Sequence, residues 1–198
     1  MKKRSALRPN SVFLNLPFDQ QYEAIFVAYV VGLVTLGMEP RCILEVDEDG
    51  DGRMGRLYKL IEECGCSIHD ISYRGTEFRY NMPFELGIAY ALTPKSPQRK
   101  LVIFEAKRRD LLKTLTDLRG FDPKVHGMRG KKALAMIYEC FSTPSLGNSE
   151  EIGRDIYRRI TKLLPQFRDG RPSVFNRKSF QWLIHATANF AKARRSPQ

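Results

Sequence analysis

Residues 81–91 place a carboxylate, Glu85, in the first turn of an apolar helix. Asn81 is a favourable N-cap, and Pro83 is tolerated in a first turn because its missing N–H would have no intrahelical partner there, so we expect the helix to begin near residue 82. A carboxylate at this end of a helix is favoured as an anion. Besides that structural role, it is suited to attack an electrophilic carbon or to stabilise positive charge on a substrate.

A second carboxylate, Asp70, lies at the end of the short apolar run 66–71. In an open parallel sheet, ligands bind beyond the carboxyl ends of the strands, near the point where the strand order reverses. We expect Asp70, the turn at 15–18 and the helix of Glu85 to converge there. Paired carboxylates allow one group to attack or stabilise a sugar carbon while the other orients a hydroxyl or handles the proton. His69 should point away from Asp70 by the two-residue period of a strand, which predicts a core or supporting role.

The elements that must position these groups are predicted by short apolar runs that alternate with longer helical patterns over residues 11–145. This alternation predicts β-α-β units in a doubly wound α/β domain, with a flavodoxin-like parallel sheet of about five strands. The predicted strands are 12–16, 41–46, 66–71 and 100–105, and the predicted helices are 20–37, 53–64, 82–91, 106–115 and 131–141, with a fifth strand close to the last of them.

Residues 146–198 form a basic C-terminal extension in which two appended helices are expected, over 149–163 and 175–193. Much of the net charge of +11 lies at the two ends of the chain: residues 1–10 and 151–198 hold 15 basic and 3 acidic residues, whereas 11–150 hold 18 and 19. No nucleic-acid-binding motif accompanies this charge, so a solvated basic surface is favoured over contact between the termini and nucleic acid. Apolar side chains of the last helix, Phe180, Trp182, Leu183 and Phe190, predict a docking face, and a homo-oligomer is expected.

The sequence disfavours membrane-spanning, zinc-binding, disulfide-rich and calcium-binding proteins. The longest uncharged apolar stretch, 24–38, is shorter than the roughly 20 residues of a membrane-spanning helix, and no apolar signal core follows the first residues, so a cytoplasmic protein without membrane contact is expected. The four cysteines form no Cys-x-x-Cys pair, which predicts neither a zinc site nor a disulfide framework. The acidic turn 47–52 matches the start of a calcium loop, but the twelfth position is Tyr58 instead of glutamate. We therefore predict no metal and no cofactor.

Three segments share an order and spacing with a known family: Phe13-Leu14-Asn15-Leu16-Pro17-Phe18, Ile68-His69-Asp70-Ile71-Ser72 and Phe84-Glu85-Leu86-Gly87-Ile88-Ala89-Tyr90-Ala91. Together they resemble the motifs of the nucleoside 2-deoxyribosyltransferase-like superfamily, a relative of TIR-like domains, over about residues 11–110. The resemblance implies that Glu85 is the nucleophile that attacks the anomeric carbon, that Asp70 contacts the sugar or the base, and that Phe18 lines the base pocket. The first motif carries Asn15 and Pro17 as further substrate contacts, with Asn15-Leu16 where those enzymes usually have Ala-Gly.

Two further residues could reach the substrate. Asn81 could hydrogen-bond a ribose hydroxyl, and Arg119 could hold a nucleotide phosphate or form a local ion pair. The expected function is cleavage or transfer at the N-glycosidic bond of a nucleoside or nucleotide, either as a deoxyribosyltransferase-like enzyme or as an N-glycosidase of nicotinamide dinucleotide or another nucleotide, including effectors of bacterial defence. The alternative is a non-catalytic, TIR-like module for nucleotide sensing or assembly.

Overall fold

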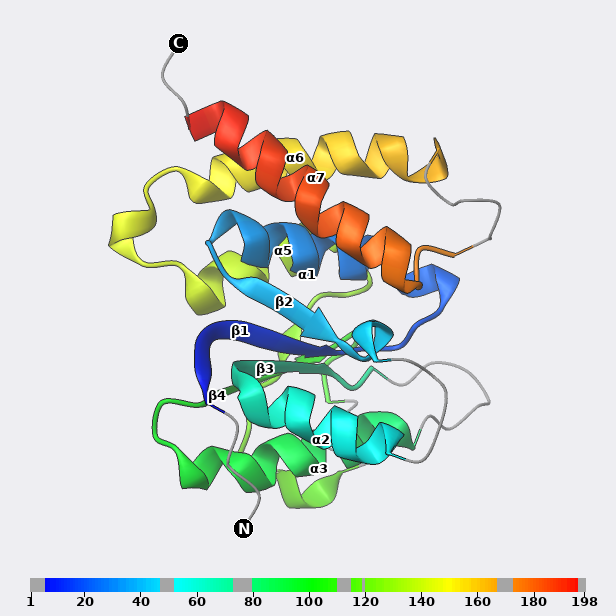
Figure 1. Ribbon diagram of the computed structural model, residues 1–198, viewed down its shortest axis with the longest axis vertical. Coiled ribbons are helices and arrows are strands. Elements are labelled where there is room, and N and C mark those ends of the chain that lie inside the picture. The colour runs from blue at the N-terminus through cyan, green and yellow to red at the C-terminus, as the bar shows by residue number, and fades with distance from the viewer. Residues whose placement is uncertain are drawn as a thin grey trace. The chain divides into compact units, whose positions relative to one another are not determined.

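The computed structural model describes residues 6–46, 52–72, 80–109, 115–118, 120–166 and 173–195. Strands and longer helices alternate along the first two thirds of the chain, and helices alone follow (Figure 1). In chain order the elements are β1 (Arg8–Asn15), α1 (Glu23–Thr35), β2 (Glu39–Cys42), α2 (Arg53–Glu63), β3 (Cys64–Asp70), α3 (Asn81–Leu92), β4 (Lys100–Glu105), β5 (Lys124–Val125), α5 (Gly130–Phe141), α6 (Ser149–Leu163) and α7 (Arg177–Arg195).

The five strands form one sheet in the order β2-β1-β3-β4-β5, and every neighbouring pair is parallel. This is the strand order of the flavodoxin-like, doubly wound α/β fold, so the predicted fold class is confirmed. From β1 the chain first adds β2 on one side and then β3 on the other. The switch point therefore lies between the carboxyl ends of β1 and β3, where Asn15 is in register with His69.

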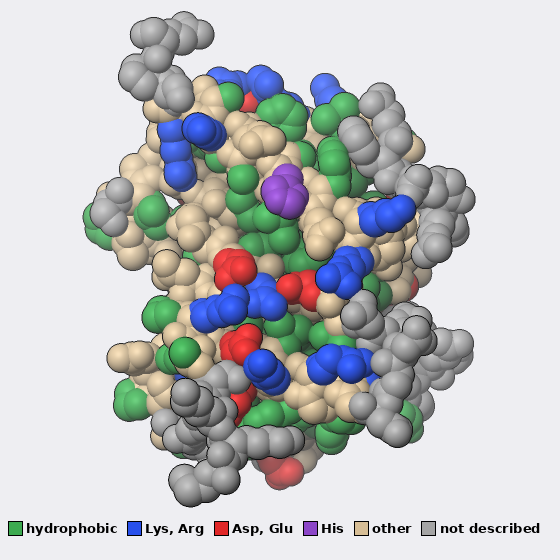
Figure 2. Space-filling view, viewed as in Figure 1, with side chains coloured by type: hydrophobic (Ala, Val, Ile, Leu, Met, Phe, Trp, Pro, Cys, Tyr) green, Lys and Arg blue, Asp and Glu red, His purple; other side chains and the backbone are tan. Residues whose placement is uncertain are grey.

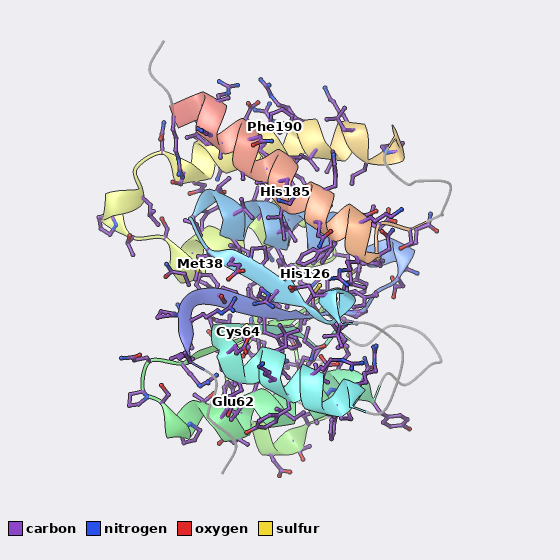
Figure 3. The ribbon with its side chains drawn as sticks, in the orientation of Figure 1. Met38, Glu62, Cys64, His126, His185 and Phe190 are labelled. Atoms are coloured by element: carbon purple, nitrogen blue, oxygen red, sulfur yellow. The ribbon has the colours of Figure 1, made fainter. Side chains whose placement is uncertain are left out.

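The central strand β3 is buried along its whole length, as expected for a parallel strand covered on both faces. It begins at Cys64, directly where α2 ends; this residue is labelled in Figure 3. Gly65 allows the close approach of β1, because a Cβ at this position would lie 2.6 Å from the backbone oxygen of Pro9. The register between β1 and β3 shifts in the same region.

Helices α2 and α3 pack side by side on one face of the sheet (Figure 1). On α2, the buried residues Leu57, Leu60 and Ile61 recur at helical spacing and meet Phe13 of β1. Leu86 of α3 belongs to a smaller buried cluster at the other end of this face, with Ile71 and Ile103. This face of the sheet carries the candidate site.

Some predicted boundaries differ from the structure. The second strand ends at Cys42 instead of residue 46, because Ile43–Glu45 turns into a short 3-10 helix whose Glu45 Oε1 accepts a hydrogen bond of 2.9 Å from the Cys42 amide. The fifth strand that was predicted close to the helix 131–141 is present as Lys124–Val125, which is two residues long and precedes α5. Of the helix predicted over 106–115, residues 106–109 form a bend and a turn in which Arg109 has φ 69°, and 110–114 lie outside the described residues.

By internal contacts the chain divides into two compact units. The sheet unit comprises Met1–Pro17 and Glu39–Val125, and the helical unit comprises Phe18–Met38 and His126–Gln198. In the helical unit, α1 is apolar and buried along most of its length and packs against α5, α6 and α7. The two predicted C-terminal helices are confirmed as α6 and α7. No helix in the described ranges combines the length and apolarity that crossing a membrane requires.

Candidate functional site

Glu85 lies on the buried side of α3, in the same stripe as Met82 and Ala89, and only 5% of the residue is exposed. The helix begins one residue earlier than predicted, because Tyr80 already has helical dihedral angles and accepts the first helical hydrogen bond, from Phe84 N. Asn81 is therefore the exposed first residue of the helix and not its N-cap. Glu85 consequently lies in the second turn, where the helix dipole stabilises an anion less than in the first.

Burial raises the pKa of Glu85 from its ordinary 4.5 to about 7, and the positive charge of Arg53 acts in the opposite direction. Arg53 is the exposed first residue of α2. Within the described part of the chain, no group donates a hydrogen bond to the Glu85 carboxylate. Both protonation states are thus populated near neutral pH, whereas the sequence predicted a carboxylate favoured as an anion.

The Glu85 carboxylate is within electrostatic reach of Cys42, the last residue of β2. Burial, above all, raises the pKa of the Cys42 thiol well above its ordinary value, and the negative charges of Glu45 and Glu85 act in the same direction. Cys42 is in register with Leu14 of β1, so Glu85 faces the carboxyl ends of these strands. This is the edge of a parallel sheet at which ligands bind in doubly wound folds.

Asn15 connects the ends of β1 and β3 to the first turn of α3. Its Nδ2 donates to the backbone oxygen of Met82 at 2.9 Å and lies 2.9 Å from Nδ1 of His69. Because an amide nitrogen only donates, Nδ1 of His69 is the acceptor and its proton resides on Nε2. Burial lowers the pKa of His69 to about 3, so the imidazole is neutral. One side chain therefore fixes both the tautomer of His69 and the position of the helix that carries Glu85.

Two polar atoms of this arrangement, Oδ1 of Asn15 and Nε2 of His69, are buried without a hydrogen-bond partner in the described residues. Leaving a buried donor or acceptor unpaired costs roughly 1–3 kcal/mol for each group. Such exceptions are rare in folded proteins, and a catalytic role, strain or a bound water or ion accounts for those that occur. The sequence analysis missed this contribution of His69, although Asn15 and His69 are both polar residues at the ends of apolar strands.

Asp70 projects from the opposite face of β3. It follows His69 directly, and His69 lies on the face of α3, since its ring centroid is 6.0 Å from that of Phe13. Asp70 is fully buried, and its Oδ1 accepts hydrogen bonds from the hydroxyl and the amide of Ser72, at 2.5 and 3.2 Å. Its charge does not contribute to the raised pKa of Glu85. The structure thus brings Glu85 together with Asn15 and His69, and it does not pair the two carboxylates on one face.

Comparisons with known proteins give no family for this chain. No protein-family model matches the sequence, and no curated protein matches it. The resemblance to the nucleoside 2-deoxyribosyltransferase-like superfamily therefore stays a prediction from the three sequence motifs. The candidate site rests on its own geometry.

The other predicted site residues are distributed between the units or lie outside the described ranges. Pro17 is buried directly after β1 in the sheet unit. Phe18 belongs to the helical unit, where its ring packs against those of Phe26 and Phe175, with centroid distances of 6.2 and 5.2 Å. Arg119 lies outside the described residues, as does most of the acidic turn, 47–51. In the ranges that are described, no cluster of three or more His, Cys, Asp or Glu residues could hold a metal ion.

Proposed function

We propose that the protein cleaves or transfers at the N-glycosidic bond of a nucleoside or nucleotide, with Glu85 as the group that acts on the anomeric carbon. The observation that carries the proposal is the buried Glu85 carboxylate, whose pKa is raised to about 7, facing the carboxyl ends of the strands beside the topological switch point. The sequence resemblance supports the same residue for the same role. The proposal includes the cytoplasmic location and the homo-oligomer expected from the sequence.

The chemistry suits a buried carboxylate. As the bond between the sugar and the base breaks, positive charge develops on the anomeric carbon. A nearby anion lowers this barrier whether it forms a bond or only stabilises the charge, and its effect is stronger in a site of low dielectric. In the covalent form, Glu85 attacks the anomeric carbon, the base leaves with the electron pair and takes a proton from water, and the glycosyl ester is then cleaved by water or by a second base. Glu85 is therefore active in its ionised form.

Asn15 and His69 would support this reaction, but neither would supply the proton that the leaving base requires. A neutral imidazole with a pKa of about 3 cannot serve as a general acid near neutral pH. Asn15 instead holds the first turn of α3, through Met82, against the ends of β1 and β3. We assign to both residues a positioning role for Glu85. The contact of Asp70 with sugar or base stays an expectation from the resemblance, because this carboxylate leaves the sheet on the other face.

The test is chromatography of the purified protein after incubation with nucleosides, deoxynucleosides, nucleotides and nicotinamide dinucleotide, with release of free base as the readout. Glu85→Gln should abolish the release while ligand affinity changes by no more than a few-fold. Glu151→Gln, the same change at an exposed position of α6, is the matched control and should leave the release unchanged. Binding of a nucleotide without any release would refute the enzyme and favour the sensing or assembly module. Release that persists in Glu85→Gln would refute the role of this residue.

A further inference from the structure

A pocket of about 410 Å³ lies in the helical unit, between α5 and α6. Its lining combines two buried residues, Leu134 and Tyr157, with three exposed cations, Lys131, Arg154 and Arg158. Among the described residues, no carboxylate lines it. A volume of this size is within the range of small-molecule sites, roughly 300–1,000 Å³, and such sites typically join an apolar floor to a few charged groups.

The floor of the pocket is fixed by close packing at the start of α5. Tyr157 OH donates to the backbone oxygen of Ala24 at 3.3 Å, and the tyrosine ring lies directly beside Gly130, the first residue of the helix. A Cβ at Gly130 would be only 3.0 Å from Cζ of Tyr157 and 2.7 Å from that same oxygen, so a larger residue would not fit. Burial raises the pKa of the Tyr157 phenol, which keeps it neutral. The floor is therefore preformed, apolar and uncharged.

The cations around the pocket are incompletely neutralised. Arg154 pairs with Glu150 at 2.5 Å, but Arg158 is 3.5 Å from Asp155, which also pairs with two other arginines. Lys131 has no carboxylate partner among the described residues. On the face shown in Figure 2, further basic side chains, in blue, are scattered over α6 and α7. The positive end of the α5 dipole adds to this field, so the pocket attracts anions.

We propose that this pocket binds an organic phosphate of the nucleoside di- or triphosphate class. Its phosphate groups would lie against Lys131, Arg154 and Arg158, which are the side chains that recognise phosphate through charge-assisted hydrogen bonds. Its flat apolar part would lie against Leu134 and Tyr157. A single-stranded nucleic acid is the less suitable ligand, because its successive bases stack on several aromatic rings, whereas Tyr157 is the one aromatic side chain in the described lining of the pocket. The pocket belongs to the helical unit and Glu85 to the sheet unit, so this inference does not depend on the proposed function.

The test is isothermal titration calorimetry at low ionic strength with adenosine, AMP, ATP and inorganic tripolyphosphate. ATP should bind more tightly than AMP, adenosine should not bind, and tripolyphosphate should bind more weakly than ATP because it lacks the apolar part. The double variant Lys131→Ala/Arg158→Ala should weaken the ATP affinity by at least about tenfold. The double variant Lys162→Ala/Lys178→Ala removes the same charge from exposed positions outside the pocket and should change the affinity by less than about twofold.

The double variants also distinguish the two sites, because a nucleotide bound beside Glu85 in the sheet unit would not respond to Lys131→Ala/Arg158→Ala. An ATP affinity that this variant leaves unchanged would overturn the proposal. Equal weakening by both double variants would mean attraction to net charge alone and would overturn the proposal. The absence of ATP binding would also overturn the proposal. An oligothymidylate that binds more tightly than ATP, and whose affinity falls in Lys131→Ala/Arg158→Ala, would overturn it as well. Circular dichroism of each variant shows that a loss of affinity does not arise from unfolding.

Discussion

Replacing Glu85 with glutamine should remove a pH-dependent loss of stability. The pKa of this carboxyl is about 7 in the folded protein against an ordinary 4.5, so the folded state binds the proton more tightly than the unfolded chain does. The free energy of unfolding of the wild type therefore falls as the pH rises from about 4.5 to about 7, and the full cost persists above that range. At 1.36 kcal/mol per pH unit, the difference between the two pKa values corresponds to about 3 kcal/mol.

The assay is urea denaturation of wild type and Glu85→Gln at about pH 5 and about pH 8, followed by circular dichroism and by the fluorescence of the single tryptophan, Trp182. The two probes must coincide before a single free energy is extracted, because the chain has two compact units. We expect the variant to gain about 2.5 kcal/mol relative to the wild type between these pH values, because pH 5 already lies above the unfolded pKa. Glu151→Gln, at an exposed position, should show no such gain. A stability difference between Glu85→Gln and wild type that is the same at both pH values would refute the burial argument.

Other perturbations test the remaining parts of the site. The rate of base release should rise with pH and level off above an apparent pKa of about 7, and Arg53→Gln should move this midpoint upward in a pH–rate profile, because the charge that favours ionised Glu85 is lost. Asn15→Asp should lower kcat more than it raises KM, and cost roughly 1–3 kcal/mol in denaturation, since a carboxylate cannot donate the hydrogen bonds to Met82 of α3 and to His69 of β3. Gly65→Ala should lower the free energy of unfolding by about 1–3 kcal/mol in urea denaturation, because its methyl group would lie 2.6 Å from a backbone oxygen of β1. Gly55→Ala, where a Cβ meets open space, should not lower it in the same assay.

The sequence predicted the sheet well because the signal for a buried parallel strand is local. The strand β3 was recognisable from a short, mostly uncharged segment, although it also buries Ser67, His69 and Asp70. The helix of Glu85 was recognisable from Pro83 and the apolar residues that follow it. The predicted ends of the strands and helices were less accurate. The end of β2 depends on the hydrogen bond that Glu45 makes to the amide of Cys42, a contact that no hydrophobic period encodes.

The composition of the candidate site depended on side-chain directions across strands. Local pattern placed Asp70 and Glu85 at the same edge of the sheet, but the alternation of β3 sends Asp70 to one face and His69 to the other. The pairing of Asn15 with His69 follows from the register of β1 with β3, which sequence periodicity does not specify. The raised pKa of Glu85 likewise reflects burial by elements distant in sequence. These are tertiary properties, and a single sequence without its pairings contains no direct signal for them.

The energetics of this edge favour function over structural support. A carboxylate retained for stability is expected to be paired or hydrogen-bonded, which lowers its pKa. Glu85 shows the reverse, because burial raises its pKa against only a partial offset from Arg53. Near the same strand ends, two buried polar atoms, on Asn15 and His69, have no hydrogen-bond partner among the described residues. Each of these features lowers stability, and replacement by apolar residues would relieve it. A fold that keeps all three at its topological switch point is best explained by a ligand or a reaction at that place.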